Sequence, residues 1–134
     1  MSNLLKISEA ANLAIHTMYL LAMNKDKLIS TKEIALTLKV SENHLSKVLQ
    51  RLVKVGYVES IRGPKGGFRL STDDSITMLE IYEAIDGNIH NCNCLLPSPI
   101  CEKGHCILDG FLNEVNSKFR ETLARKKLSE ICKK

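Results

Sequence analysis

Four of the five cysteines in this 134-residue chain lie within a stretch of fifteen residues. They are Cys92, Cys94, Cys101 and Cys106, whereas Cys132 stands apart near the end and is expected to be an ordinary thiol. The N-terminal sequence lacks the pattern of a signal peptide, so we expect a cytoplasmic protein. In that compartment, clustered thiols favour metal or redox chemistry over a framework of disulfides.

The spacing of these thiols distinguishes the kinds of metal centre that they could form. Six residues lie between Cys94 and Cys101, and four lie between Cys101 and Cys106. Structural zinc sites usually contain close Cys-x-x-Cys pairs, and no such pair occurs here. Three more widely spaced thiolates favour an iron–sulfur cluster, because a cluster is larger than a single ion. A zinc site with His105 as fourth ligand, a thiol–disulfide switch and incidental thiols are the alternatives.

Positive charge gathers in the first half of the chain, away from the cysteines. Residues 1–72 carry a net charge of +6, whereas residues 73–134 carry −2. Localised positive charge is typical of proteins that bind nucleic acid. Hydrophobic residues make up 44% of the chain and charged residues 25%, as in globular proteins, and no apolar run is long enough to cross a membrane.

The periodicity of this basic half predicts a helix-turn-helix. Residues 8–24 repeat apolar residues at three- and four-residue intervals, with Ser8 as a cap. A Ser-x-x-Glu capping box at Ser30 starts a second helix. Ser41 caps a third helix, which ends near Gly56. This helix carries an apolar stripe on one side and a polar, basic face on the other. Two helices joined by so short a turn are typical of a helix-turn-helix.

A glycine-rich hairpin is predicted directly after the third helix, with strands at residues 57–62 and 68–71. Its three glycines would let the tip approach another backbone closely. A helix-turn-helix followed by a basic hairpin is a winged helix, which predicts binding to double-stranded DNA. The third helix would lie in the major groove, Lys47, Arg51 and the hairpin would meet phosphates, and Arg62 could enter the minor groove. The predicted DNA-binding residues are Ser41, Glu42, Asn43, His44, Lys47, Arg51, Arg62, Gly63, Pro64, Lys65, Gly66 and Gly67.

The second half of the chain predicts a connecting helix, a loop and a long helix. A capping box at Thr77 starts the first of these helices, for which Leu79, Tyr82 and Ile85 are expected to face inward. The long helix, predicted over 107–125, carries an apolar stripe with little core left to cover, so a second subunit is its natural partner.

The predicted fold is mainly α with a small β hairpin, and it has three parts. Residues 1–75 form a winged helix-turn-helix that binds DNA, and residues 76–106 form a connecting helix with the cysteine loop. Residues 107–134 form a dimerisation helix with a C-terminal tail. The sequence contains no catalytic triad, no paired carboxylates in a pocket setting and no phosphate-binding loop, so we do not expect an enzyme.

These segments resemble the Rrf-two family of bacterial winged-helix transcription regulators over almost the entire chain. The resemblance is carried by SENHLSKVLQRLVKVGYV, by the hairpin IRGPKGGFRL, by three cysteines before a long helix and by the closing LARKKLSEI. The hairpin sequence Arg-Gly-Pro-x-Gly-Gly is the most specific of them. The resemblance implies a homodimer that binds a roughly palindromic operator near promoters. Our main hypothesis is that the protein is a sensor and a repressor.

The resemblance also implies a cofactor. In cluster-bearing members of the family, three cysteines hold a [2Fe–2S] or [4Fe–4S] centre, and the presence, oxidation state or nitrosylation of that centre alters operator affinity. By position these cysteines would be Cys94, Cys101 and Cys106. The best-known spacing is five and five rather than six and four, and Cys92 could replace Cys94.

The fourth ligand to such a cluster differs among members of the family. Asp109 falls where one member supplies a histidine, and Asn12 and His16 lie in the first-helix region that supplies the ligand in others. Some members lack a cluster. A cluster-free or zinc-containing regulator, controlled by a thiol switch, a small molecule or a partner protein, is therefore the alternative.

Overall fold

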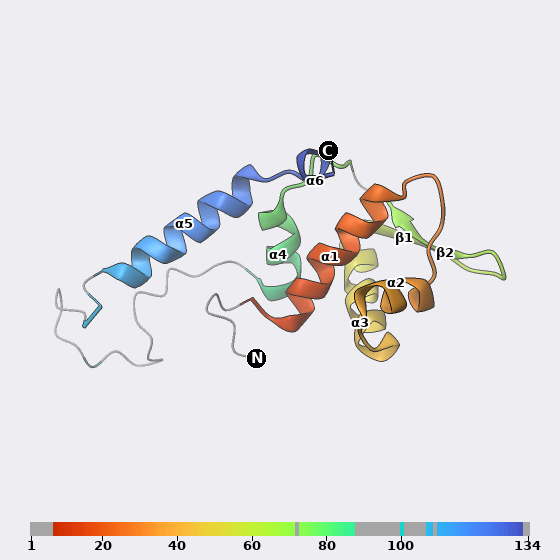
Figure 1. Ribbon diagram of the computed structural model, residues 1–134, viewed down its shortest axis with the longest axis horizontal. Helices are drawn as coiled ribbons and strands as arrows, with labels where there is room; N and C mark the ends of the chain where they lie inside the picture. Colours follow the sequence, from red (N-terminus) through yellow and green to blue (C-terminus); the bar gives the residue numbers. More distant parts are fainter. Residues whose placement is uncertain (1–6, 72, 88–99, 101–106, 109, 133–134) are drawn as a thin grey trace.

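The computed structural model describes residues 7–71, 73–87, 100, 107–108 and 110–132. In Figure 1, the first four helices and a hairpin form a body, and the long helix α5 extends away from it to the left. This arrangement confirms the predicted fold class, mainly helical with one two-stranded antiparallel hairpin. No helix of the described residues is long and apolar enough to cross a membrane. The elements are α1 (Glu9–Met23), α2 (Thr31–Leu38), α3 (Glu42–Lys54), β1 (Val58–Ile61), β2 (Gly67–Leu70), α4 (Met78–Asp86), α5 (Phe111–Arg125) and α6 (Leu128–Ile131).

The helices of the body begin at the predicted caps. The side chains of Ser8, Ser30 and Ser41 each accept a hydrogen bond from the backbone three residues later, at 3.0, 3.2 and 3.1 Å. Thr77 and Glu80 form a complete capping box, in which each side chain pairs with the other residue's backbone. These bonds satisfy amides that have no partner within the helix, and so fix where each helix starts.

The core of the body lies between α1, α3 and α4. Of the apolar stripe predicted on α3, Leu45, Val48, Leu49 and Leu52 are buried, whereas Val53 is only half-buried. On α4 the prediction was wrong for Leu79, which is only half-buried, because the inner face runs through Ile81 instead. The buried residues of that face are Met78, Ile81, Tyr82 and Ile85, spaced by three, one and three positions, as one side of a helix requires.

The first strand of the hairpin is shorter than predicted, 58–61 instead of 57–62, and the second spans 67–70 instead of 68–71. A third segment of the chain also pairs with the hairpin. Ile29, in the link before α2, exchanges two backbone hydrogen bonds with Phe68 on β2, at 3.0 and 2.8 Å. A Cβ atom on Gly67 would lie 2.8 Å from the carbonyl oxygen of Ile29, and one on Gly66 would lie 2.0 Å from that of Ile61. Both glycines therefore lie close to backbone of the same chain, Gly66 in the turn and Gly67 at the start of β2.

The C-terminal part departs most from the expectation. Helix α5 begins at Phe111, not at Ile107, and Gly110 precedes it. After α5 the chain returns to the body: the amide of Leu128 donates to the carbonyl of Ile76, and that of Met78 donates to Lys126, both at 2.9 Å. Leu128 is fully buried there. The tail predicted to accompany the dimerisation helix thus packs into the core of the DNA-binding body.

Candidate nucleic-acid interface

The polar face of α3 divides into an outward stripe and a flank. At 3.6 residues per turn, Asn43, Lys47, Gln50 and Lys54 lie opposite the buried stripe, and all four are exposed. We call these four residues the outward stripe. Helical spacing from Lys47 could have added Gln50 and Lys54 to the predicted DNA-binding residues.

The flank of α3 holds His44 and Arg51, which are seven residues apart. The Nδ1 atom of His44 lies 3.7 Å from a carboxylate oxygen of Glu9 on α1. The Nη2 atom of Arg51 donates to the backbone carbonyl of Ile85 on α4, at 2.7 Å. Both side chains were predicted to face DNA, but in the structure each turns toward a neighbouring helix. Arg51 remains exposed, but one donor of its guanidinium is engaged within the chain.

The remaining predicted residues lie at the cap of α3 and at the hairpin tip, where all are exposed except Gly66 and Gly67, which are half-buried. Ser41 and Glu42 lie exposed at the N-terminus of α3. At the tip, the amide of Gly66 donates to the carbonyl of Gly63 at 2.9 Å, which closes a tight turn. Residues 62–65 of that turn are all exposed, so the hairpin presents the charges of Arg62 and Lys65 to solvent.

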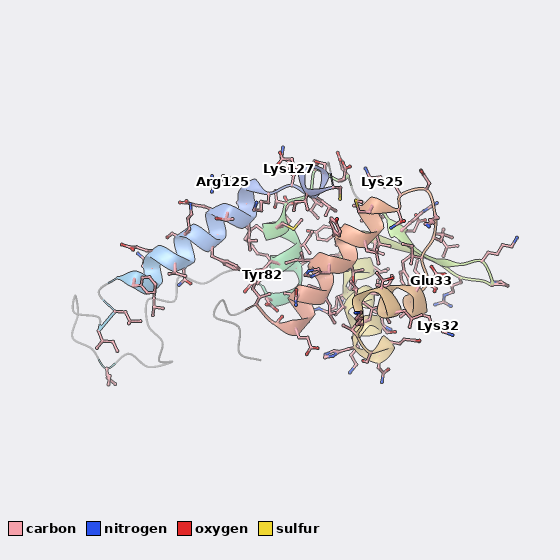
Figure 2. The ribbon with its side chains drawn as sticks, viewed as in Figure 1. Lys25, Lys32, Glu33, Tyr82, Arg125 and Lys127 are labelled. Atoms are coloured by element: carbon pink, nitrogen blue, oxygen red, sulfur yellow. The ribbon has the colours of Figure 1, made fainter. Side chains whose placement is uncertain are left out.

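Further positive charge lies on the body outside the predicted set. Lys32, exposed in the first turn of α2, lies at the lower right of the body in Figure 2, near the side that carries α3. The first helix of a helix-turn-helix crosses the DNA backbone, so this position suits a phosphate contact. The sequence signal was available, since Lys32 lies two residues after the predicted cap Ser30.

Most of the candidate metal ligands lie outside the described residues, namely Cys92, Cys94, Cys101, Cys106 and Asp109, together with the alternative zinc ligand His105. Among the residues that are described, no group of three or more metal-binding side chains comes together.

Asn12 and His16, the first-helix candidates, are both exposed on α1. The Nδ1 atom of His16 lies 2.8 Å from the backbone carbonyl oxygen of Asn12. A carbonyl only accepts, so Nδ1 of the neutral ring carries the proton and Nε2 keeps its lone pair. His16 also lines a pocket of about 300 Å³ between α1, α4 and α6, with Tyr19, Met78 and Leu128 among its other walls.

The end of α1 is held to the body by an ion pair. Lys25, at the upper end of α1 in Figure 2, contacts the carboxylate of Asp74. The hydrogen bond between them raises the pKa of Lys25 and lowers that of Asp74. The neighbouring Cys132 is half-buried, and burial raises the pKa of its thiol. This thiol is therefore held in its protonated, less reactive form at neutral pH.

The body, the exposed stripe of α3 and the basic hairpin define the class of a winged-helix DNA-binding protein. The family model for Rrf2, described as "Iron-dependent Transcriptional regulator", matches residues 7–134. The chain belongs to the Rrf2 family, as its sequence motifs predicted. It is a DNA-binding transcriptional regulator of that family.

Relatives of known name support this assignment. The HTH-type transcriptional regulator NsrR of Bacillus licheniformis is 33% identical over 120 residues, which cover 84% of this chain and 81% of the relative. NsrR of Bacillus subtilis is 38% identical over 102 residues, or 70% of each chain. These relatives are transcriptional regulators and not enzymes, in agreement with the prediction.

Solved structures show the same fold. CymR, the global cysteine regulator of B. subtilis, matches 96% of this chain and 97% of its own with a TM-score of 0.78 and 27% identity. IscR of T. potens matches 95% of this chain and 85% of its own, with a TM-score of 0.72 and 22% identity.

Proposed function

We propose that this chain is a dimeric repressor that binds operator DNA through α3 and the hairpin, and whose affinity is set by an iron–sulfur cluster. The observation that carries the DNA-binding part is the outward stripe of α3, exposed on a body that also presents a basic hairpin. A regulator of this kind works in the cytoplasm, where it reaches promoter DNA.

The side chains of the outward stripe suit contacts both to base edges and to phosphates of DNA. The amides of Asn43 and Gln50 suit paired hydrogen bonds to an adenine edge, whereas Lys47 and Lys54 suit phosphates. Ser41 and Glu42, at the N-terminus of α3, would lie closest to the base edges. The hairpin would follow the backbone, and Arg62 suits the negative potential of a narrow minor groove.

The dimer is proposed from the exposed apolar side of α5. Phe111 is 56% exposed, and α5 contains no buried residue among those described. A helix of fifteen residues whose apolar stripe is exposed at Phe111 and elsewhere only half-buried is the feature that a second copy of the chain would cover. Two copies would then present two α3 helices to the two halves of an operator.

The cluster is proposed on the chemistry of its donors. Cys94, Cys101 and Cys106 supply three thiols within thirteen residues, which suits iron–sulfur ligation. His16 has the arrangement of a metal-binding histidine, with one ring nitrogen fixed by a carbonyl and the other available. Asn12, Asp109 and Cys92 are the other candidates for completing the set. A bound cluster would link the cysteines to one another and add a charged, redox-active group beside them.

Anaerobic purification tests this proposal. We expect coloured protein containing iron and acid-labile sulfide, and operator affinity that changes about ten- to a hundredfold when the cluster is lost, which corresponds to ~1.4–2.8 kcal/mol. Cys101→Ala should abolish the colour, whereas Cys132→Ala should leave it. A colourless, iron-free protein that binds its operator with undiminished affinity would contradict the cluster.

The second candidate is a cluster-free regulator that responds through its thiols, a small molecule or a partner protein. It is favoured by the similarity to CymR, which is described as a cysteine regulator and whose Staphylococcus aureus counterpart has been solved in an oxidised form. Metal analysis distinguishes the two: about one equivalent of zinc, or no metal, without sulfide would favour this candidate.

A further inference from the structure

Arg51 makes the contact that joins α3 to the end of α4. Its guanidinium donates from Nη2 to the carbonyl oxygen of Ile85 at 2.7 Å. Ile85 lies in the last turn of α4, whose carbonyls have no amide partner further along the helix. A cation there also interacts favourably with the negative end of the helix dipole. The contact therefore has a local role that does not depend on DNA.

The same turn of α4 is fastened to α1. The backbone amide and the hydroxyl of Ser8 both donate to the carboxylate of Asp86, at 3.3 and 2.5 Å. The next residue on α1, Glu9, lies 3.7 Å from His44 at the other end of the flank of α3. The flank of α3 therefore lies beside α1 at its first turn and is hydrogen-bonded to α4 at its third turn, and those two helices are tied to each other by Ser8 and Asp86.

The outward stripe depends on this support, because the direction of α3 decides where Asn43 and Lys47 point. A shift of the helix end by one or two ångströms would misplace hydrogen bonds that work only between 2.7 and 3.2 Å. Arg51 itself lies on the flank, about 40° or more around the helix from the stripe residues.

We propose that Arg51 is a positioning residue for DNA binding: it holds α3 against the last turn of α4 and makes no phosphate contact. The proposal rests on the proposed role of α3 as the helix that enters the major groove.

Salt dependence separates a positioning residue from a phosphate contact. Removing a side chain that neutralises a phosphate lowers the slope of log K against log salt by about 0.9 per contact. Removing a positioning residue lowers affinity and leaves the slope unchanged. Lys47→Gln is the matched comparison, since it removes one positive charge from the same helix, on the outward stripe.

The experiment measures binding of wild type, Arg51→Gln and Lys47→Gln to a duplex that wild type selects from a random-sequence pool, at several salt concentrations. We expect Arg51→Gln to bind about tenfold or more weakly with the wild-type slope, and Lys47→Gln to reduce the slope. Asp86→Asn, which weakens the tie to Ser8, should also lower affinity without changing the slope, and should add little to Arg51→Gln. If circular dichroism shows that Arg51→Gln does not fold, Asp86→Asn tests instead whether support of α3 from the end of α4 affects affinity without changing the slope.

A reduced slope for Arg51→Gln, or affinity equal to that of wild type, would overturn the positioning role while leaving the proposed function intact. If wild type selects no duplex at all, the proposed function fails, and the inference fails with it.

Discussion

Helices α3 and α5 have similar lengths and are both amphipathic, but only α3 buries its apolar side within the chain. Of the thirteen residues of α3, four apolar ones are buried against the body. Of the fifteen residues of α5, none is buried. At the end of α5 nearest the body, Phe119 packs edge-to-face on Tyr82 with ring centroids 5.6 Å apart, whereas Phe111 at the far end is 56% exposed.

This difference teaches that an amphipathic pattern specifies an apolar side without specifying what covers it. Helix α3 lies on the body, between α1, α2 and β1, so its stripe is covered by its own chain. Helix α5 leaves the body along its length in Figure 1, so its cover decreases from Leu123 toward Phe111. The part that remains uncovered is the part for which we propose a second copy.

The largest effect is expected where the segment after α5 enters the core. Leu128 is fully buried, so Leu128→Ala should lower the free energy of unfolding by about 2–5 kcal/mol. Urea denaturation followed by circular dichroism measures this. Ile131→Ala, at a position 40% exposed on the same short helix, is the control and should cost clearly less. Equal effects of the two changes would show that the tail is not part of the core.

The next effect concerns the uncovered end of α5. Phe111→Glu should shift the protein from dimer to monomer in sedimentation and weaken operator binding about a hundredfold, because two linked half-sites bind jointly. Glutamate in the first turn suits the helix dipole, so α5 itself should persist. The control is Ser117→Glu, which adds the same charge on the opposite, polar side of α5. Dissociation by both variants, or by neither, would argue against this face as the interface.

A smaller effect is expected at the covered end of α5. Phe119→Leu removes the edge-to-face contact with Tyr82 and should cost about 0.5–1.5 kcal/mol of unfolding free energy beyond the loss of buried area. The same change should leave the dimer intact if Phe119 serves the chain's own body. Thermal unfolding and sedimentation of one sample measure both. If Phe119→Leu abolished the dimer but left the stability unchanged, the dimer interface would have to lie at this end of α5.

The smallest effect is expected at the ion pair of Lys25 and Asp74. The pKa of Asp74 lies below its ordinary 3.8, so its contribution is present above that pH and is lost as pH falls through the lowered value. The pKa of Lys25 lies above 10.5, so its contribution is lost only as pH rises beyond that. Asp74→Asn should therefore melt slightly below wild type at pH 7, and the difference should shrink as the pH falls below 3.8 and through the lowered pKa of Asp74. A difference that persists in acid would mean that the pair is not its cause.

Helix caps and apolar stripes are local, and the sequence by itself determined them. Ser8, Ser41 and Thr77 cap helices because each hydroxyl reaches an amide only three residues away. The stripe of α3 follows from helical spacing, and the hairpin sequence Arg-Gly-Pro-x-Gly-Gly identified the family. These features depend on contacts within a few residues, so periodicity and composition are enough to predict them.

Long-range contacts were decided only by the tertiary structure. Helical spacing places Lys47 and Arg51 only about 40° apart, both off the apolar stripe, so it does not tell which of them contacts a neighbouring helix. The difference arises because the end of α4 places the backbone carbonyl of Ile85 beside one of them. The third partner of the hairpin, Ile29, and the buried Leu128 depend in the same way on segments that are distant in sequence. Which polar side chain faces solvent and which holds a neighbouring helix is fixed by the packing of those helices, and helical periodicity carries no information about that packing.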